Sequence, residues 1–442
     1  MNKFERKPSR LGILIVGLGG AVATTAVAGI ELLKLGVIGT EGLPLADVAD
    51  KFKANLTAYE DIVFGGWDLS VDDLATAAAA HNVLTLTQFN QAAPHLQQIV
   101  PFSAIGNLEY CRKVTGENLF STDSHRASVA QIRQNIRDFR RSNECNEVVV
   151  INLASTEKFI DKKSTAFSSL KNFEAALDSN APEIAPAMLY AYAAIAEGAP
   201  YGNFTPSVAA DIPALVEFAE KNGVPVAGKD GKTGQTMMKT ALAPALKTRA
   251  LKVEGWYSTN ILGNRDGLAL SDPDSLKSKV TTKGSVLDDI LGYKVEDHIV
   301  DIRYYRPRGD NKEAWDNIDV TGFLGQPMQI KINFLCKDSI LAAPLAIEIA
   351  RVLELAKRRG QGGVQPQLSV FFKLPQVRDE VNEKPVHALH VQETMLLNWL
   401  ESESSTSNGN GNGHGKIDGQ NINEVATAAN LAKNSEGGKN QN

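Results

Sequence analysis

The feature that most constrains the fold is a short apolar block followed directly by a glycine cluster. Residues 11–16 read LGILIV, and residues 17–20 read GLGG. A β-branched apolar block suits a buried strand, the glycines suit a tight turn, and the small residues up to Ile30 suit a helix. A strand, a glycine turn and a helix form the opening of a nucleotide-binding βαβ unit.

The same stretch has a competing interpretation as a signal peptide or membrane anchor. Residues 11–30 carry no charge and follow a basic N-terminal segment, residues 1–10. About 20 apolar or small residues satisfy the length of a bilayer span. The glycines divide this run after its sixth residue, and no other long apolar run occurs. We therefore predict an α/β protein of the cytoplasm that contacts no membrane.

The glycine cluster is an incomplete dinucleotide fingerprint. Gly17, Gly19 and Gly20 let the backbone approach a pyrophosphate at a helix N-terminus, together with Ala21. The third glycine of GxGxxG would fall at Val22. Asp68, which follows the apolar block 61–67, is the candidate acid for a ribose, although it lies farther along the chain than the usual ~20 residues. A turn that binds no ligand is the alternative.

Two kinds of periodicity divide the rest of the chain. Residues 61–69 form a short apolar block, and residues 148–155 are typical of a buried parallel strand. Helices are predicted near 74–80 and over 186–197 and 212–223. Residues 298–307 and 328–337 instead alternate with period two, as strands of an antiparallel or mixed sheet do. A periodic helix follows over 341–360, and then a short apolar strand or turn over 368–375.

Composition excludes several classes of protein. The 442 residues contain 46 Lys+Arg against 51 Asp+Glu, a formal charge of −5, which argues against a nucleic-acid partner. The three cysteines lie far apart without CxxC spacing, so no disulfide framework or zinc cluster is indicated and a reducing cytosol fits. Residues 401–442 are rich in Ser, Asn and Gly and are predicted to be a disordered tail.

A glycine-rich loop, residues 228–236, reads GKDGKTGQT. Its backbone amides, two lysines, Thr233 and Gln235 offer the several donors that a phosphate takes. The loop lacks the GxxxxGK[ST] spacing of a P-loop. A surface hairpin with solvated lysines is the alternative.

Further lysines stand in or beside apolar segments. Lys279 and Lys283 are spaced to share one helical face, which is usually a solvated face. Lys312 and Asp338 are single charges at the edges of apolar segments. Lys373, in FFKLP, would hold an ammonium against a hydrophobic wall, where its pKa falls and it can act as acid or base. Each of these alone also suits a structural role.

Taken together, these segments resemble the inositol-3-phosphate synthase family, also called myo-inositol-1-phosphate synthase. The resemblance runs from the glycine cluster to about Pro375, most of the ordered chain. Its strongest segments follow in the family's order: GKDGKTGQT at 228–236, LGNRDG at 262–267, SKVTTKGSVLDDI at 278–290, GDNK at 309–312 and KDSILAAP at 337–344.

This resemblance implies an enzyme that converts D-glucose 6-phosphate to 1D-myo-inositol 3-phosphate. Carbon 5 is oxidised, a proton leaves carbon 6, the enolate attacks the carbon 1 aldehyde, and the ketone is reduced. It implies a tightly bound NAD that is recycled, and it leaves open a need for ammonium or a divalent cation. The implied fold is a Rossmann-type NAD-binding domain (11–235 and 342–400) interrupted by a mixed-sheet α+β catalytic and tetramerisation domain (236–341), in a homotetramer.

The resemblance also implies residue roles, with no metal ligand assigned. Lys279 is the proton acceptor and donor at carbon 5, and Lys312 and Lys373 stabilise the developing oxyanions. Asp338 orients a lysine, and Asp230 supports the substrate or the lysines. Substrate and phosphate binding falls to Thr233, Gly234, Gln235, Leu262 and Lys283. Cofactor binding falls to Gly17, Gly19, Gly20, Ala21, Asp68, Thr156, Asn264 and Asp266, with Glu157 beside Thr156.

Several positions depart from the family's pattern. Its glycine loop commonly continues with Asn-Asn-Gly, where this chain has residues 21–23, AVA. Lys229 stands where the family usually has an acid, and Arg265 stands where it usually has an asparagine. The sequence of residues 205–213 also differs from that of the family. Two other hypotheses therefore stay open: a paralogue that acts on another sugar phosphate, and a nucleotide-binding scaffold without activity. The retained lysines argue against the scaffold.

Overall fold

The first strand and helix form as the sequence predicts. The computed structural model describes residues 10–51, 55–111, 114–122, 124–263, 267, 285–379 and 382–402. In β1 (Leu11–Val16) all six residues are buried, residues 17–20 form a turn, and α1 (Ala21–Lys34) follows. Within the described residues, no helix has the length and apolarity needed to cross a membrane.

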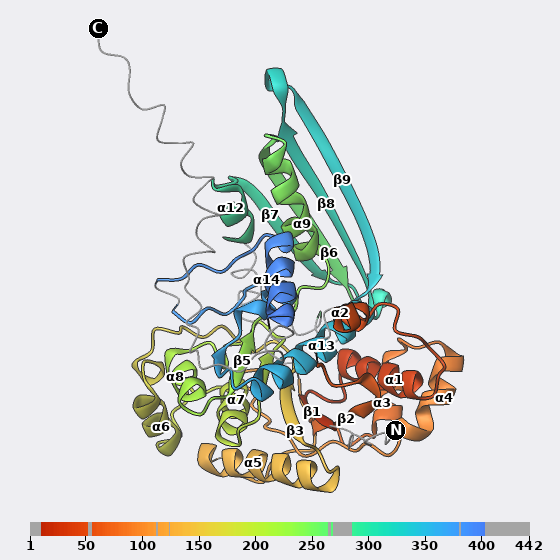
Figure 1. Ribbon diagram of the computed structural model, residues 1–442, viewed down its shortest axis with the longest axis vertical. Coiled ribbons are helices and arrows are strands. Elements are labelled where there is room, and N and C mark those ends of the chain that lie inside the picture. The colour runs from red at the N-terminus through yellow and green to blue at the C-terminus, as the bar shows by residue number, and fades with distance from the viewer. Residues whose placement is uncertain are drawn as a thin grey trace, which may run out of the picture. The chain divides into compact units, whose positions relative to one another are not determined.

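A parallel sheet organises the larger part of the chain (Figure 1). Its six strands run in the order β10-β5-β4-β3-β1-β2, and every pairing is parallel. Besides β1, the strands are β2 (Ile62–Trp67), β3 (Glu147–Asn152), β4 (Tyr201–Asn203), β5 (Pro225–Gly228) and β10 (Gly363–Val364). The chain places β2 on one side of β1 and β3 on the other, so the strand order reverses at β1. Ligands bind at such a point in open α/β sheets.

Helices cover both faces of this sheet, which explains its continuously apolar strands. Leu14 of β1 and Val150 of β3 belong to a core shared with α5 (His125–Ser142) and α7 (Pro186–Ala196). Ile15 and Ile151, the next residues along, belong to a second core shared with α1 and α13 (Asp338–Arg358). Successive side chains of a strand point to opposite faces, so both cores are filled from the same strands.

Shorter helices complete the two outer layers. They are α2 (Ala46–Lys51), α3 (Leu74–His81), α4 (Leu86–Leu96), α6 (Leu170–Asp178) and α8 (Pro213–Lys221), with 3-10 turns at Tyr59–Asp61 and Thr165–Phe167. The helices predicted near 74–80 and over 186–197 and 212–223 are therefore confirmed.

A second sheet of four strands is mixed, as the period-two segments predict. Its order is β7-β6-β8-β9; β6 pairs in parallel with β7, and the other two pairings are antiparallel. The strands are β6 (Lys252–Leu262), β7 (Asp297–Tyr304), β8 (Asn311–Thr321) and β9 (Pro327–Lys337). The helices α9 (Gln235–Thr248) and α12 (Ser285–Leu291) share an apolar core with this sheet. Short 3-10 turns, Arg306–Arg308 and Phe323–Gly325, follow β7 and β8.

Helix α13 connects the second sheet back to the first. It starts directly after β9, three residues before the predicted start at Leu341, and its buried residues join the core of the parallel sheet. Residues 368–375, predicted as a strand or turn, form the end of a 3-10 helix (Pro366–Phe371) and then an antiparallel bridge between Phe372 and Gly231. The last described helix is α14 (Leu389–Glu401). Nearly all of the predicted tail, from residue 403 onward, lies outside the described residues.

Candidate active site

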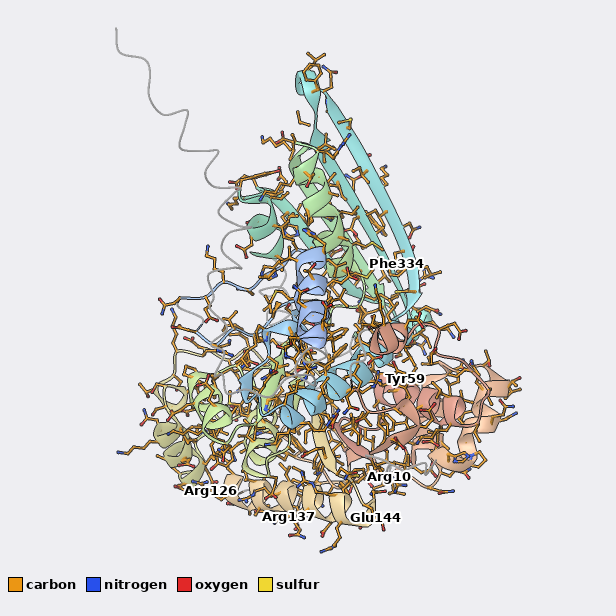
Figure 2. All side chains as sticks on the ribbon, viewed as in Figure 1. Arg10, Tyr59, Arg126, Arg137, Glu144 and Phe334 are labelled. Atoms are coloured by element: carbon orange, nitrogen blue, oxygen red, sulfur yellow. The ribbon has the colours of Figure 1, made fainter. Side chains whose placement is uncertain are left out.

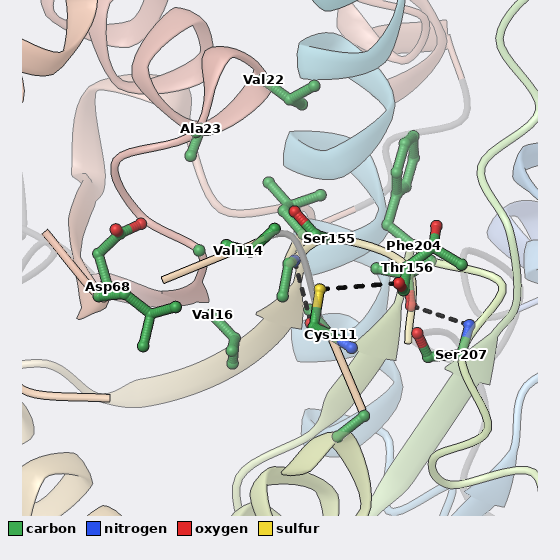
Figure 3. A pocket seen from close by; sticks show the side chains of 18 of the residues that line it. Val16, Val22, Ala23, Asp68, Cys111, Val114, Ser155, Thr156, Phe204 and Ser207 are labelled. Atoms are coloured by element: carbon green, nitrogen blue, oxygen red, sulfur yellow. Dashed lines mark hydrogen bonds between the residues drawn. The ribbon is translucent and has the colours of Figure 1, made fainter. Parts of the chain in front are cut away.

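A cavity of about 610 Å³ opens at the carboxyl ends of β1, β2 and β3. This is the point at which the strand order reverses, where open α/β sheets bind their ligands. Of the residues predicted for the site, ten line it: Gly17, Gly20, Ala21, Asp68, Thr156, Asp230, Thr233, Lys312, Asp338 and Lys373. Figure 3 shows one part of its wall, including Asp68, Thr156 and Phe204.

The glycine turn brings the backbone close to its neighbours in a way that side chains would prevent. Gly17 has a φ of +86°, and a Cβ there would lie 3.0 Å from Ala154 Cα. A Cβ on Gly19 would lie 3.2 Å from the carboxylate of Asp68. Gly20 is the N-cap of α1 and adds no capping side chain, so the first amides of the helix stay available to an anion.

Asp68 lies beside the glycine turn despite its distance along the chain. It directly follows β2, and its Oδ2 accepts a hydrogen bond of 2.7 Å from the amide of Gly19, while Ser70 N donates to Oδ1 at 3.0 Å. Part of the chain between Gly20 and Asp68 packs against α13 instead of lying in the turn. Tyr59 lies in that segment (Figure 2). Its hydroxyl donates to Glu348 of α13 at 2.5 Å, and the guanidinium of Arg351 lies 3.9 Å from the centre of its ring.

His81 is a residue of this site that the sequence did not reveal. It ends α3 and lines the cavity, and its Nε2 lies 2.8 Å from the carbonyl oxygen of Gly19. Gly19 is thereby held at its amide by Asp68 and at its carbonyl by His81. A lone histidine at a helix end carries no spacing signal that would point to this contact.

The first turn of α1 differs from that of a complete fingerprint. Val22 occupies the position of the third glycine and lines the cavity with Ala21 and Ala23 (Figure 3). The third glycine normally allows close packing of helix on strand. In this chain Ala23 and Ala26 are fully buried on α1 and serve that packing with small side chains.

A buried carboxyl group borders the cavity near Thr156. Glu157 is 6% exposed, and its Oε1 accepts a hydrogen bond of 3.0 Å from Ala187 N at the start of α7. Burial raises the pKa of Glu157 from its ordinary value of 4.5 to about 8, although the Ala187 amide opposes the shift. The carboxyl is therefore mainly protonated at neutral pH.

We expect this carboxyl to make folding stability depend on pH. The unfolded chain ionises near 4.5 and the folded chain near 8, so stability is full below the unfolded pKa and falls as pH rises through this window. Glu157→Gln should match the wild-type melting temperature at pH 4 and exceed it at pH 8.5. Glu60→Gln, at an exposed carboxylate, is the control. Parallel melting curves for the wild type and Glu157→Gln would contradict the shift.

Lys373 and Asp230 form a buried ion pair in the cavity wall. Lys373 Nζ lies 2.6 Å from Asp230 Oδ1, and the two residues are 8% and 3% exposed. Their backbones pair as well, since Lys373 N donates to Asp230 O at 2.7 Å and Lys232 N donates to Phe371 O at 2.8 Å. This antiparallel register places the two side chains together although 143 residues separate them.

A second pair, Lys312 and Asp338, joins the two sheets at the cavity. Lys312 Nζ donates to Asp338 Oδ1 at 3.3 Å, and Thr233 Oγ1 donates to the same oxygen at 3.4 Å. Lys312 lies at the start of β8 and Asp338 at the start of α13. Asp310 holds the start of α13 beside β8. Its backbone carbonyl accepts a hydrogen bond of 3.1 Å from Asp338 N, and its carboxylate accepts one of 2.6 Å from Ser339 Oγ.

Other predicted site residues lie away from the cavity or beyond the described chain. Gly19, Gly234, Gln235 and Leu262 do not line it. The side-chain amide of Gln235 instead accepts a hydrogen bond from Asn260 Nδ2 and donates one of 3.4 Å to the carbonyl oxygen of Thr259 on β6. Lys279, Lys283, Asn264 and Asp266 lie outside the described residues.

The two lysines of the glycine-rich loop also point elsewhere. Lys229 is paired with Asp211 at 2.9 Å. Lys232 donates to Gln392 of α14, and burial lowers its pKa to about 7. Neither lysine lines the cavity. The phosphate donors that this loop can still offer to the cavity are therefore the Thr233 hydroxyl and backbone amides of residues 230–233.

The fold and the site together define a class of protein. A parallel sheet with a glycine turn after β1, an acid after β2 and a cavity at the strand reversal is a Rossmann-type dinucleotide-binding domain. Two lysine–carboxylate pairs in the same cavity supply preorganised charges of the kind that stabilise developing oxyanions. The glycine turn and Asp68 fit NAD, because the bare amides suit its pyrophosphate and the carboxylate suits its ribose.

Comparison with known proteins narrows the class to one family. The family described as Myo-inositol-1-phosphate synthase matches residues 40–401. An inositol-3-phosphate synthase 1 of Bacteroides thetaiotaomicron is 43% identical over 419 residues, covering 90% of this chain and 97% of the relative. The inositol-3-phosphate synthase of Dictyostelium discoideum is 33% identical and covers 80% of this chain and 76% of its own. This chain belongs to the myo-inositol-1-phosphate synthase family.

Solved structures agree with this assignment. The crystal structure of inositol-3-phosphate synthase from Caenorhabditis elegans matches with a TM-score of 0.82 and 27% identity, covering 90% of this chain and 86% of that one. A myo-inositol-1-phosphate synthase-related protein from Thermotoga maritima matches with a TM-score of 0.73 and 26% identity, covering 88% and 98%. The predicted fold class is therefore confirmed.

Proposed function

We propose that this enzyme isomerises and cyclises D-glucose 6-phosphate to 1D-myo-inositol 3-phosphate. The observation that carries the proposal is the convergence of Lys373–Asp230 and Lys312–Asp338 on the cavity that also holds the glycine turn. The family membership and the relatives named as inositol-3-phosphate synthases support the same reaction.

The lysines serve the oxygens on which negative charge develops. When bound beside the glycine turn and Asp68, NAD would supply the hydride chemistry, as acceptor for the oxidation of carbon 5 and donor for the reduction of the ketone. Lys373 lines the cavity, and Asp230 holds its ammonium at 2.6 Å, which orients it for a substrate oxygen. A preorganised cation in a water-poor site stabilises an enolate or alkoxide far better than water does.

Lys312 and Thr233 complete the described part of the substrate site. Asp338 orients the Lys312 ammonium at 3.3 Å and accepts the Thr233 hydroxyl, so both groups are fixed before substrate binds. We assign Lys279 the proton transfer at the carbon 5 oxygen, and we assign phosphate binding to Lys283 with Gly234, Gln235 and Leu262. Asn264 and Asp266 are assigned to the cofactor with Thr156.

A turnover assay tests this function directly. Purified protein supplied with NAD and glucose 6-phosphate is expected to form inositol phosphate while total NAD and NADH stay constant. Formation of a cyclic product only from another sugar phosphate would favour the paralogue hypothesis. No product from any sugar phosphate with NAD present would reject the proposed enzyme.

A cation is a further part of the proposal. In the described residues, no group of three or more His, Cys, Asp or Glu side chains is placed to hold a metal ion. Assays after chelation, with ammonium or Mg²⁺ added back singly, show whether turnover needs either ion.

The second sheet supports a homotetramer in which residues 236–341 form the catalytic and tetramerisation domain. The side of this sheet away from α9 exposes large apolar side chains: Trp315 is 37% exposed, Ile299 48% and Leu335 62%. The register puts them on one face, since Trp315 pairs with Asn333 two residues from Leu335, and Tyr257 pairs with Ile299. An apolar sheet face of this kind marks a protein interface.

We expect Trp315→Lys to break this assembly. A buried, unpaired ammonium in an apolar interface is costly, so the variant should shift from tetramer to smaller species in light scattering. Leu86→Lys is the control, because Leu86 is 75% exposed on α4 and lies on a different part of the chain. An unchanged mass for Trp315→Lys would place the interface elsewhere.

The cytoplasm is the location we propose. Cys111, Cys145 and Cys336 all lie within the described residues, and none of them is in a disulfide there. Free thiols of this number persist in a reducing compartment.

A further inference from the structure

Three segments that are distant in sequence are joined by hydrogen bonds at the cavity wall. The loop 204–211, the loop 228–233 and residues 371–376 exchange backbone and side-chain hydrogen bonds. Asp230 N donates to Thr205 O at 3.0 Å, and Gln376 Nε2 donates to Ala210 O at 2.8 Å. Gly231 is required at this contact, because a Cβ there would lie 2.1 Å from Phe204 Cζ.

Asp211 is the charged centre of this junction. Its Oδ2 lies 2.7 Å from Lys162 Nζ and 2.9 Å from Lys229 Nζ, and its Oδ1 accepts from Ala209 N at 2.8 Å. The Asp211 side chain is 4% exposed and that of Lys229 is 10% exposed. Burial by itself would raise the pKa of Asp211, but the two ammonium groups hold it well below its usual range.

Lys229 directly precedes Asp230, the carboxylate that holds Lys373. The ammonium of Lys229 is therefore paired with Asp211, and that of Lys373 with Asp230. A buried ammonium that loses its anion is strongly disfavoured, which favours any new pairing that the local backbone permits. For Lys229 the adjacent carboxylate is that of Asp230, whose backbone is held in the left-handed region at a φ of +58°.

We propose that Asp211 is a positioning residue that keeps Lys229 away from Asp230, so that Asp230 remains paired with Lys373. The proposal rests on the proposed function, in which Lys373 acts on a substrate oxygen. Asp211 itself touches neither Lys373 nor the cavity. It acts by occupying the competing ammonium, and Lys162 adds a second cation that keeps Asp211 ionised.

A double-variant comparison tests this role. Asp211→Asn frees Lys229 to compete for Asp230, so kcat should fall at least about tenfold with a smaller change in KM. Lys229→Met removes the competitor and leaves Asp211 paired with Lys162, so its kcat should stay within about twofold of the wild type. In Asp211→Asn/Lys229→Met no competitor remains, and kcat should recover to within about threefold of Lys229→Met.

The rescue separates positioning from mere structural support. If the double variant is as slow as Asp211→Asn, or if Asp211→Asn keeps full activity, the proposal is overturned. If Asp211→Asn does not fold, Asp211→Ser is compared with and without Lys229→Met in the same way. Each rate is compared with that of the wild type. If the wild type itself is inactive, the proposed function is rejected, and the pairing of Lys229 and Lys373 is tested by the structure of the variant.

A crystal structure of Asp211→Asn reads out the pairing without any turnover. Lys229 Nζ within hydrogen-bond distance of Asp230, with Lys373 displaced, supports the proposal. A Lys373–Asp230 pair that keeps its 2.6 Å separation overturns it.

Discussion

Lys373→Met is expected to lower turnover by at least about a thousandfold while the protein still binds NAD. A preorganised charge at a developing oxyanion contributes roughly 10²–10³ or more in rate, and the Lys373 ammonium is proposed to supply that charge. Methionine keeps the length and apolar stem of lysine and removes only the ammonium. Steady-state kinetics with glucose 6-phosphate measure the loss, and Lys221→Met, at an exposed lysine on α8, is the control.

Stability and catalysis can be separated at this ion pair. Lys373→Met leaves Asp230 buried without its cation, which costs about 3–5 kcal/mol of folding stability. Lys373→Met/Asp230→Asn removes the stranded charge, so its melting temperature should recover while its activity stays low. Recovery of activity in the double variant would show that Lys373 serves the fold and not the reaction.

Gly17→Ala is expected to weaken NAD binding by about tenfold to a hundredfold, equivalent to ~1.4–2.7 kcal/mol. Gly17 has a φ of +86°, in the left-handed region, where a Cβ costs roughly 1–2 kcal/mol before any contact is counted. The added methyl would also lie 3.0 Å from Ala154 Cα, so the turn must move. Calorimetric titration with NAD measures the change in affinity.

Gly29→Ala is the matched control for this change. Gly29 lies inside α1, and a Cβ there meets nothing within 4 Å. Alanine in a helix interior is more favourable than glycine by roughly 0.5–1 kcal/mol, so this variant should bind NAD normally and melt slightly higher. Equal NAD affinities for Gly17→Ala and Gly29→Ala would mean that the turn does not contact the cofactor.

Much of the site could be predicted from the sequence because its residues belong to compact motifs. Lys312 and Asp338 stand at the edges of apolar segments, and Asp230 and Thr233 stand in a glycine-rich loop. What the sequence could not show is the pairing of Lys312 with Asp338 and of Lys373 with Asp230. These contacts depend on the register of β8 with β9 and of residues 228–232 with 371–376, and register over such separations leaves no local pattern.

The residues that were missed share one property: their partners are distant and of ordinary type. His81 contacts a backbone carbonyl, and Asp211 holds two lysines. The two loop lysines illustrate the reverse case. Lys229 and Lys232 look like phosphate donors in sequence, yet tertiary packing pairs each with a buried partner away from the cavity.

The sequence alone determined the local elements around which this protein is built. The apolar strand Leu11–Val16, the turn that needs Gly17, and the period-two strands of the second sheet follow from side-chain pattern and backbone freedom, which act within a few residues. Only the tertiary structure decided which charges meet. The Lys373–Asp230 pair and the Asp211 cluster exist because long-range pairing buries these groups together, and a buried charge then requires an opposite charge beside it.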